Sequence, residues 1–194
     1  MKVTLDTNCI IDLEENTSTA PFLRQLISLH DANKIILRTV AISASERKKG
    51  GTYAENFSEF KQKVAAAGLG HVKILPTLAY VGMCYVDWCY PVGEETLLFE
   101  QKIHEVLFPN IEFYYSDYCT RLGIDPASDI IDPKWRNAKC DVLAMWGHIR
   151  FNGDIFVTSD RNFHKPTKKA QLIALGAGNI LTPQEAVNIR LKYL

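Results

Sequence analysis

The sequence lacks an excess of charge of either sign, and it lacks a long apolar run. Lys+Arg and Asp+Glu each number 22, so the formal net charge is zero. This balance argues against broad non-specific binding to nucleic acid, but it leaves room for a local basic patch. The uncharged stretch 74–86 is broken by Pro76 and Gly82, and it is shorter than the ~20 residues that span a bilayer. We therefore expect no membrane segment.

Signatures of several common kinds of site are also missing. The cysteines form no CxxC pair and no signal peptide is evident, so we expect reduced, mostly buried thiols in a cytoplasmic protein. No Ser-His-Asp arrangement, glycine-rich phosphate loop or zinc-binding spacing is present, which disfavours the chemistries that those motifs serve. The five cysteines are Cys9, Cys84, Cys89, Cys119 and Cys140.

What is present is an ordinary globular composition with a regular α/β pattern. The 194 residues are 47% hydrophobic and 23% charged, which suits one sizeable core, and we expect a single domain over 1–194. Short apolar strands alternate with amphipathic helices, a pattern typical of a central parallel sheet flanked by helices. We expect strands near 3–5, 35–37, 72–75, 155–157 and 180–181, and helices near 9–13, 22–29, 40–46, 57–67, 97–107, 141–149 and 172–175, with a last helix after Thr182.

Three further local signals refine this pattern. Thr39 is predicted as the N-cap of the 40–46 helix, and Gly50-Gly51 as its stop. The sequence Thr182-Pro183-Gln184-Glu185 predicts a capping box at the start of the last helix. Residues 76–135 are less regular and rich in aromatic residues, which fill cores more often than they stack on bases. We expect an enlarged middle segment there.

The stretch 141–163 is the one around which the chain can be organised. Its apolar residues recur at helical spacing, which places Asp141 in or near the first turn of a helix. Asn152-Gly153 is predicted to end that helix, because glycine adopts the left-handed C′ conformation without a clash. The apolar run 155–157 then predicts a buried strand with Asp160 at its carboxyl end, the edge where ligands bind in α/β sheets.

The first strand delivers Asp6 in the same way, and Glu46 lies late in the helix after the second strand. Alone, Asp6 would be read as a cap or turn residue and Glu46 as part of a solvated helix end. Two like charges ~4 Å apart repel by roughly 4 kcal/mol at an effective dielectric of 20, so a fold that gathers acids requires a cation. The predicted carboxylates are Asp6, Glu46, Asp141 and Asp160.

Oxygen ligands of this kind favour Mg²⁺ or Mn²⁺ over Zn²⁺. A carboxylate-bound cation generates hydroxide from bound water and supports in-line displacement at phosphorus, with one ion or with two. Neutral side chains beside the acids could orient water or a phosphate oxygen. These supporting residues are Asn8, Thr158 and Ser159.

The chain resembles a PIN-domain nuclease. The resemblance rests on LDTN around Asp6, on a Glu in the second β-α unit, and on the late motif GDIFVTSDRNF. It covers about 1–75 and 136–194, while 76–135 exceeds what a minimal member of the family needs. The family's first acid matches Asp6, its last two match Asp141 and Asp160, and its second matches Glu46 within a looser segment. Glu55 or Glu59 lies further on.

The resemblance implies a metal-dependent endoribonuclease with a carboxylate pocket at the carboxyl edge of its sheet. A toxin-type or an RNA-processing nuclease would both fit. RNA is the implied substrate, and a protein antitoxin or regulator and a homodimer are the implied partners. The resemblance also matches Asn8 to the Asn of the opening motif and Thr158 to the Thr of the late strand.

Basic residues flank the predicted metal site in two clusters. They could hold a phosphate backbone, and ordinary solvated surface is an equally good interpretation. Scattered histidines are more often structural than functional. The predicted nucleic-acid contacts are Arg47, Lys48, Lys49, Arg161, His164 and Lys165.

Three alternatives stand beside this hypothesis. A phosphatase of the haloacid dehalogenase type needs a second Asp two positions after Asp6, where this chain has Asn8, so it is disfavoured. A PIN-like interaction module without catalysis is the second alternative. A DNA-directed nuclease of related fold is the third.

Overall fold

The computed structural model of the protein describes residues 1–45, 57–127 and 131–191. Several predicted features therefore lie outside the described residues. They are Glu46, Arg47, Lys48, Lys49, Gly50-Gly51 and Glu55.

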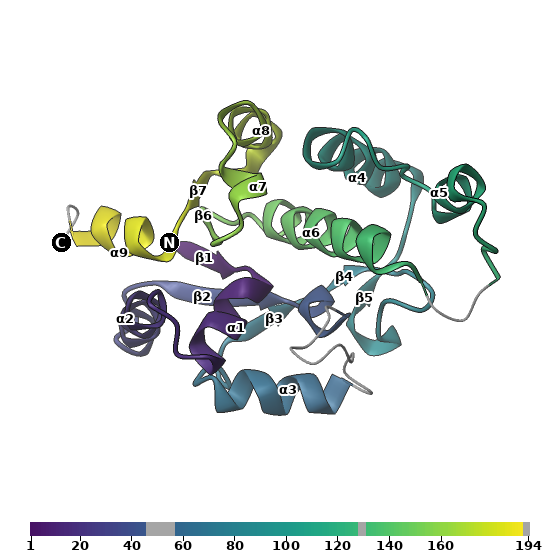
Figure 1. The fold of residues 1–194 in the computed structure, drawn as a ribbon. Coiled ribbons are helices and arrows are strands. Elements are labelled where there is room, and N and C mark those ends of the chain that lie inside the picture. The colour runs from purple at the N-terminus through teal and green to yellow at the C-terminus, as the bar shows by residue number, and fades with distance from the viewer. Residues whose placement is uncertain (46–56, 128–130, 192–194) are drawn as a thin grey trace.

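A five-stranded parallel sheet forms the centre of the fold (Figure 1). The strand order is β3-β2-β1-β6-β7, so the first strand pairs with both the second and the sixth. Leu5 of β1 is in register with Val157 of β6, which brings the carboxyl ends of these strands together. The strands of this sheet are β1 (Lys2–Leu5), β2 (Ile36–Val40), β3 (Lys73–Leu75), β6 (Ile155–Val157) and β7 (Asn179–Leu181), and β4 (Thr77–Leu78) pairs in parallel with β5 (Cys89–Tyr90) in a separate ribbon.

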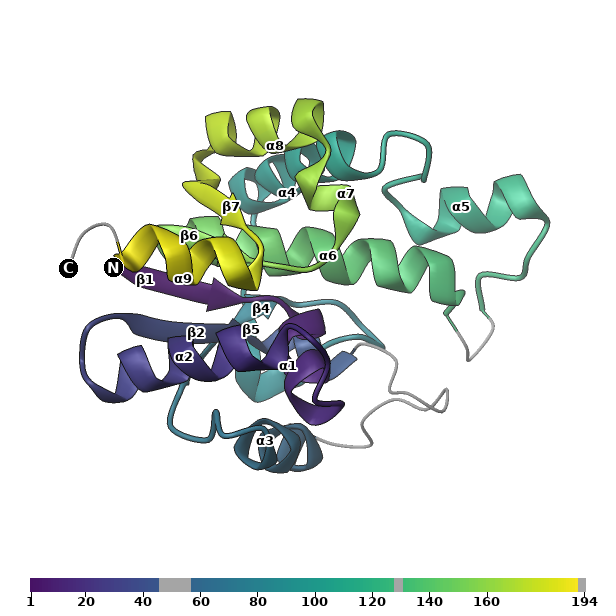
Figure 2. The same cartoon turned by 60° about the vertical axis from the view of Figure 1, so that its left-hand side comes forward.

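Helices cover both faces of the sheet. One face carries α1, α2, α3 and α9, with α9 beside α2 (Figure 2), and the other carries α6, with α4, α5, α7 and α8 packed on its side. The α-helices are α1 (Thr7–Glu14), α2 (Ala20–Asp31), α3 (Phe57–Ala66), α4 (Glu94–Leu107), α5 (Tyr115–Leu122), α6 (Pro133–Arg150), α7 (Arg161–His164), α8 (Pro166–Leu172) and α9 (Pro183–Leu191). Three short helical turns are η1 (Ala41–Ser45), η2 (Val86–Trp88) and η3 (Ile173–Ala177).

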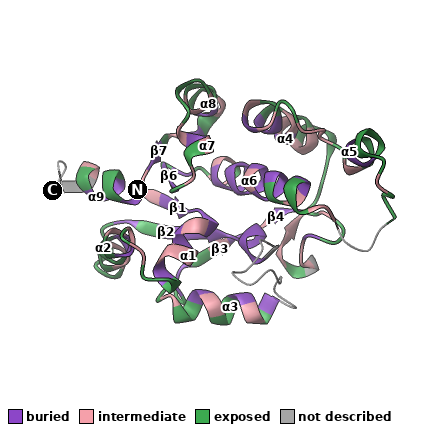
Figure 3. Cartoon of the chain, in the orientation of Figure 1, coloured by how far each residue is buried: buried purple, intermediate pink, exposed green. Residues whose placement is uncertain are grey.

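The strands build two cores by alternation. Val3 and Leu5 point into the core beneath α1 and α2, together with Ile155 and Val157. Phe156, between these last two, points to the opposite core beneath α6. A strand buried on both faces reads as a continuous apolar run, and β6 is buried along its whole length. Figure 3 shows the middle of the sheet as mostly buried between the two helical layers. No helix in the described part of the chain has both the length and the apolar character needed to cross a membrane.

The predicted strands are confirmed: 155–157 has the predicted bounds, and the ends of the others differ by at most three residues. The capping box is also confirmed, since Glu185 accepts from the Thr182 amide at 2.8 Å and Thr182 Oγ1 accepts from the Glu185 amide at 3.2 Å. The prediction for Thr39 is wrong, because Thr39 lies within β2 and a short 3₁₀ turn, η1, follows. Its hydroxyl donates to the Leu5 carbonyl across the sheet at 3.5 Å, which favours the strand over a helix cap.

Two predictions for the late helix need correction. Asp141 is not in the first turn, because α6 begins at Pro133 with Asp132 as its N-cap. The left-handed residue after the helix is Asn152, with φ 53°, and not Gly153. Gly153 is required for a different reason: a Cβ there would lie 2.1 Å from His148 Cε1.

The middle segment is tied to α6 by a buried ion pair. Lys139 Nζ donates to Glu100 Oε1 at 2.8 Å, and both side chains are almost fully buried. The Tyr80 hydroxyl donates to Glu100 Oε2 at 2.7 Å, and the Lys139 ammonium lies 3.8 Å from the centre of the Phe113 ring. Some aromatic residues of this segment, which are predicted to fill a core, therefore surround the buried ammonium group of Lys139.

Candidate active site

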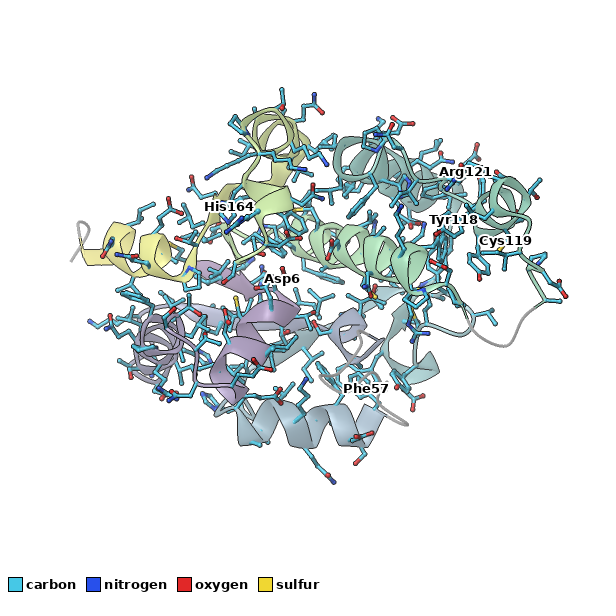
Figure 4. All side chains as sticks on the ribbon, viewed as in Figure 1. Asp6, Phe57, Tyr118, Cys119, Arg121 and His164 are labelled. Atoms are coloured by element: carbon cyan, nitrogen blue, oxygen red, sulfur yellow. The ribbon has the colours of Figure 1, made fainter. Side chains whose placement is uncertain are left out.

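Asp6 is held at the carboxyl end of β1, where it caps helix α1. Its extended backbone (φ −73°, ψ 163°) turns Oδ1 onto the Thr7 amide at 2.8 Å. Oδ2 accepts from Asn8 Nδ2 and from Thr158 Oγ1, both at 2.7 Å. Asp6 is 3% exposed, so its carboxylate is fixed by three donors in a nearly dry position. Figure 4 shows it at the start of α1.

Thr158 connects the first and last predicted motifs. Its hydroxyl donates to Asp6 and accepts from Asn8 Nδ2 at 2.9 Å and from the Asp160 amide at 3.0 Å. Asn8 Oδ1 in turn accepts from the Ser159 amide at 3.0 Å. The structure therefore brings together the predicted supporting residues and two of the predicted acids. The adjacency of β1 and β6 is the cause, because both motifs follow directly after these strands.

Asp160 stands beside Asp6 as the second carboxylate. It caps α7, and its Oδ1 accepts from the Asn162 amide at 2.8 Å. Burial raises the pKa of Asp6 to about 6, and the negative charge of Asp160 adds to this rise. The hydrogen bonds from Thr158, Thr7 and Asn8 lower the pKa of Asp6 but do not overcome the burial. The pair is thus a place where negative charge is disfavoured without a cation.

A divalent ion could bind these two carboxylates only if they keep free lone pairs. Asp6 Oδ1 accepts one hydrogen bond, and Asp160 Oδ2 accepts none from the described residues. Hard oxygen donors of this type suit Mg²⁺ or Mn²⁺. Within residues 1–45, 57–127 and 131–191, no three His, Cys, Asp or Glu side chains gather closely enough to hold an ion by themselves. The described residues thus supply two ligands of a candidate site.

Asp141 lies on α6, on the side of the sheet opposite α1 and α2. The Gly147 Cα sits against Val40, since a Cβ there would lie 3.0 Å from Val40 Cγ1. Asp141 precedes Gly147 in α6 by roughly 9 Å along the helix axis, at a rise of ~1.5 Å per residue. Asp141 therefore lies beyond the carboxyl end of β2. It is half-buried. The four-acid cluster stays a prediction, because Asp141 joins no described group of three acids.

Glu46 follows directly after η1, and η1 itself borders the Asp6 region. The Thr7 hydroxyl donates to Ser43 Oγ at 2.7 Å, with both side chains buried. This bond fixes η1 against the start of α1. Residues 41–45 therefore lie close to the helix that Asp6 caps.

The predicted basic contacts fall into two groups after Asp160. Arg161 and Lys165 are exposed and free to meet a polyanion from solvent. His164 is half-buried, and its Nε2 hydrogen-bonds the Thr158 carbonyl at 2.9 Å, which supports the end of β6 (Figure 4). Lys168, further along, donates to Asn162 Oδ1 at 2.7 Å and to the Leu107 carbonyl, so it links α8 to the end of α4.

Asp12 is a residue of this region that was not predicted from the sequence. Asp12 Oδ2 accepts from Ser159 Oγ at 3.0 Å, and its Oδ1 accepts from Thr17 Oγ1 at 2.9 Å. Asp12 therefore fixes the residue between Thr158 and Asp160. Its place four residues after Asn8 on α1 was the available signal, since side chains at i and i+4 share a helix face.

No protein-family model matches the chain, and no curated protein sequence matches it. Among solved structures, it is similar to VapBC2 from Rickettsia felis, in a crystal structure described as bound to a DNA fragment from their promoter. The TM-score is 0.44 with 12% identity, covering 94% of this chain and 98% of that chain. This likeness is weak.

Proposed function

We propose that the protein is a metal-dependent nuclease that cleaves RNA. The observation that carries this proposal is the pairing of Asp6 with Asp160 at the carboxyl end of neighbouring parallel strands. One carboxylate is buried with its pKa raised, and both keep lone pairs free. Two adjacent carboxylates repel each other, and a bound divalent cation relieves that repulsion.

Asp6 and Asp160 would hold the cation, and Asp141 and Glu46 are proposed to complete its ligands. A bound Mg²⁺ or Mn²⁺ lowers the pKa of water and polarises a phosphoryl oxygen. Asn8 and Thr158 fix Asp6 Oδ2, so that Oδ1 keeps one orientation. Arg161 and Lys165 would bind the phosphates on either side of the scissile bond.

The test is cleavage of labelled single-stranded RNA and DNA oligonucleotides with Mg²⁺, with Mn²⁺ and with EDTA. We expect RNA cleavage only with metal, and loss of at least ~100-fold in Asp6→Asn and Asp160→Asn, the scale of removing one preorganised electrostatic contact. Asp117→Asn is the matched control, because this aspartate is exposed on α5. Equal activity in Asp6→Asn and wild type would refute the assignment.

Two other outcomes separate the remaining alternatives. Cleavage of DNA but not RNA would identify the DNA-directed nuclease. RNA binding without cleavage under any metal, with wild-type Asp6 and Asp160 in place, would instead support the interaction module. Mn²⁺ binding followed by calorimetry gives an independent readout, and we expect Asp160→Asn to weaken it.

A further inference from the structure

A cavity lies at the free edge of the sheet. Its residues are distant from Asp6 in the sequence, and their chemical character differs from that of the Asp6 site. The cavity has a volume of about 520 Å³, within the range of ligand-binding pockets. Its walls come from α3, from the loop before β3, from β3 itself and from Trp88. The residues that give the cavity its chemical character are Lys61, Val64, Leu69, Lys73, Ile74 and Trp88.

Strand β3 is the outermost strand at this side, since it pairs with β2 alone among the described strands. Consecutive residues Val72, Lys73 and Ile74 all line the cavity. Side chains alternate between the two faces of a strand, so a cavity over one face would meet only every second residue. The cavity therefore runs along the edge of β3, where backbone groups face outward and can pair with another strand.

The chemistry of the lining is apolar with a positive rim. Val64, Leu69 and Val72 are buried and form the floor. Lys61 and Lys73 are exposed, and no acidic residue of the described chain lines the cavity.

Aromatic side chains hold one wall of this cavity in place. The Lys61 ammonium lies 5.0 Å from the Trp88 ring centre and 5.6 Å from that of Phe57. Phe57, at the start of α3 (Figure 4), stacks on Trp88 with ring centres 4.6 Å apart. The positive rim is therefore attached to a rigid aromatic wall.

We propose that β3 is a docking edge for an extended peptide segment of another protein, one that alternates apolar and acidic residues. Backbone hydrogen bonds to β3 would give affinity, and the apolar residues would enter the cavity beside the stem of Lys61. The acidic residues would face the other side of the added strand and meet Lys73, which lies between Val72 and Ile74 of the α3-side core. A second copy of this chain fits less well, because edge-to-edge pairing would bring both lysines of each copy together. RNA fits less well because the floor is apolar and the backbone edge has no partner among phosphates.

The experiment uses the full-length protein and acetylated, amidated peptides of about six residues that alternate valine or isoleucine with glutamate. Binding is followed by ¹H–¹⁵N NMR. We expect amide shifts concentrated at 72–75 and at the Trp88 indole, and a loss of at least ~10-fold in affinity for Lys61→Glu/Lys73→Glu. Lys34→Glu/Lys134→Glu is the matched control, since both lysines are exposed elsewhere and the net charge changes equally.

Each comparison peptide or ligand tests one feature of the proposed docking edge. A peptide with the same side chains but N-methylated backbone should not bind, because it cannot add to a strand edge. Binding by the methylated peptide, equal binding by the control and the cavity variant, or absence of binding by every glutamate peptide would overturn the proposal. Preferential binding of oligouridine at 72–75, or β3-mediated dimers by sedimentation, would also overturn it. Nuclease activity is not needed for any readout, so failure here and failure of the proposed function are distinguishable.

Discussion

Asp6 and Thr158 lie 152 positions apart in the sequence and share a hydrogen bond of 2.7 Å between Oδ2 and Oγ1. The bond spans two neighbouring parallel strands at their carboxyl ends, and Thr158 is fully buried. Because the same hydroxyl also accepts from Asn8 and from the Asp160 amide, one atom sets the positions of both carboxylates.

Thr158→Val should disturb the site without changing its shape. Valine matches the volume of threonine but leaves the Asp160 amide without its acceptor and Asn8 Nδ2 with Asp6 as its one remaining acceptor, at a cost of about 1–3 kcal/mol. It should also raise the pKa of Asp6 further, because the Thr158 hydrogen bond lowers that pKa. Urea unfolding measures the first effect and NMR titration of the Asp6 carboxyl the second. Thr158→Ser keeps the hydroxyl and should stay close to wild type in both.

Asp160→Asn should leave the metal-free protein as stable as wild type, or more stable. The substitution removes a charge that raises the pKa of Asp6, and asparagine still caps α7 through the Asn162 amide. Asp6→Asn differs, since its amide nitrogen would face the Asn8 and Thr158 donors. Thermal melts in EDTA check the order of the two variants. A clear drop in melting temperature for Asp160→Asn would contradict the role of repulsion.

The pH dependence of stability should show two opposing titrations. Burial raises the pKa of Asp6 from 3.8 to about 6, so the folded state binds the extra proton and stability falls as pH rises through this window. Burial lowers the pKa of His148 from 6.5 to about 4, so the unfolded state binds the extra proton and stability is lost as pH falls from 6.5 to 4. Each effect is on the order of 3 kcal/mol, at ~1.4 kcal/mol per pKa unit.

The two contributions offset each other in the wild type between about pH 4 and pH 6. Asp6→Asn removes one of them and should expose the steep loss of stability that His148 causes on acidification. Urea denaturation of both proteins in EDTA at several pH values gives the difference directly. Parallel curves for the two proteins would show that Asp6 titrates as an ordinary aspartate.

Gly153→Ala should be one of the most damaging single-methyl additions in the chain. The new Cβ would lie 2.1 Å from His148 Cε1 and 2.8 Å from Arg38 Nη2, and both side chains are buried. We expect a loss of roughly 3 kcal/mol or more, at the upper end for overpacking. Gly93→Ala is the control, because a Cβ there meets nothing within 4 Å, and it should cost no more than about 1 kcal/mol as an N-cap change. Equal melting temperatures would contradict the packing.

Lys139→Ala should destabilise the protein by about 3–5 kcal/mol, because it leaves Glu100 buried without its cation. Glu100→Gln/Lys139→Met removes both charges and should recover much of that loss, with the glutamine still able to accept from the Tyr80 hydroxyl. Chemical denaturation of the two variants measures the difference. A double variant as unstable as Lys139→Ala would indicate that packing and not charge is responsible.

Local patterns were sufficient for the strands and for the partners of Asp6. Each strand is a short apolar run, and a parallel sheet places the residues that follow such runs along one edge. Asn8, Thr158 and Ser159 could be assigned on that basis: Asn8 and Thr158 donate to Asp6, and the Ser159 amide donates to Asn8. These residues meet because β1 pairs directly with β6 in the sheet.

The start of α6 could not be read from its apolar repeat. The repeat from Val142 onward marks the half of the helix that packs on the sheet, while the earlier half packs on the middle segment through Trp135 and Lys139. A buried lysine breaks the apolar pattern, so periodicity fails there. Asp132-Pro133, an N-cap followed by proline, was the better signal. The role of Gly153 depends on a distant histidine ring and has no local signature.

The pairing of the first strand with the sixth has a consequence for biosynthesis. While a ribosome is still making the middle of the protein, β1 and β2 have emerged, but β6, the other neighbour of β1, does not yet exist. The Asp6 carboxylate lacks the Thr158 donor, and Asp160 is not yet made, until translation has passed residue 160. A chain that ends before Thr158 therefore lacks the donor that fixes Asp6 and the carboxylate that lies beside it.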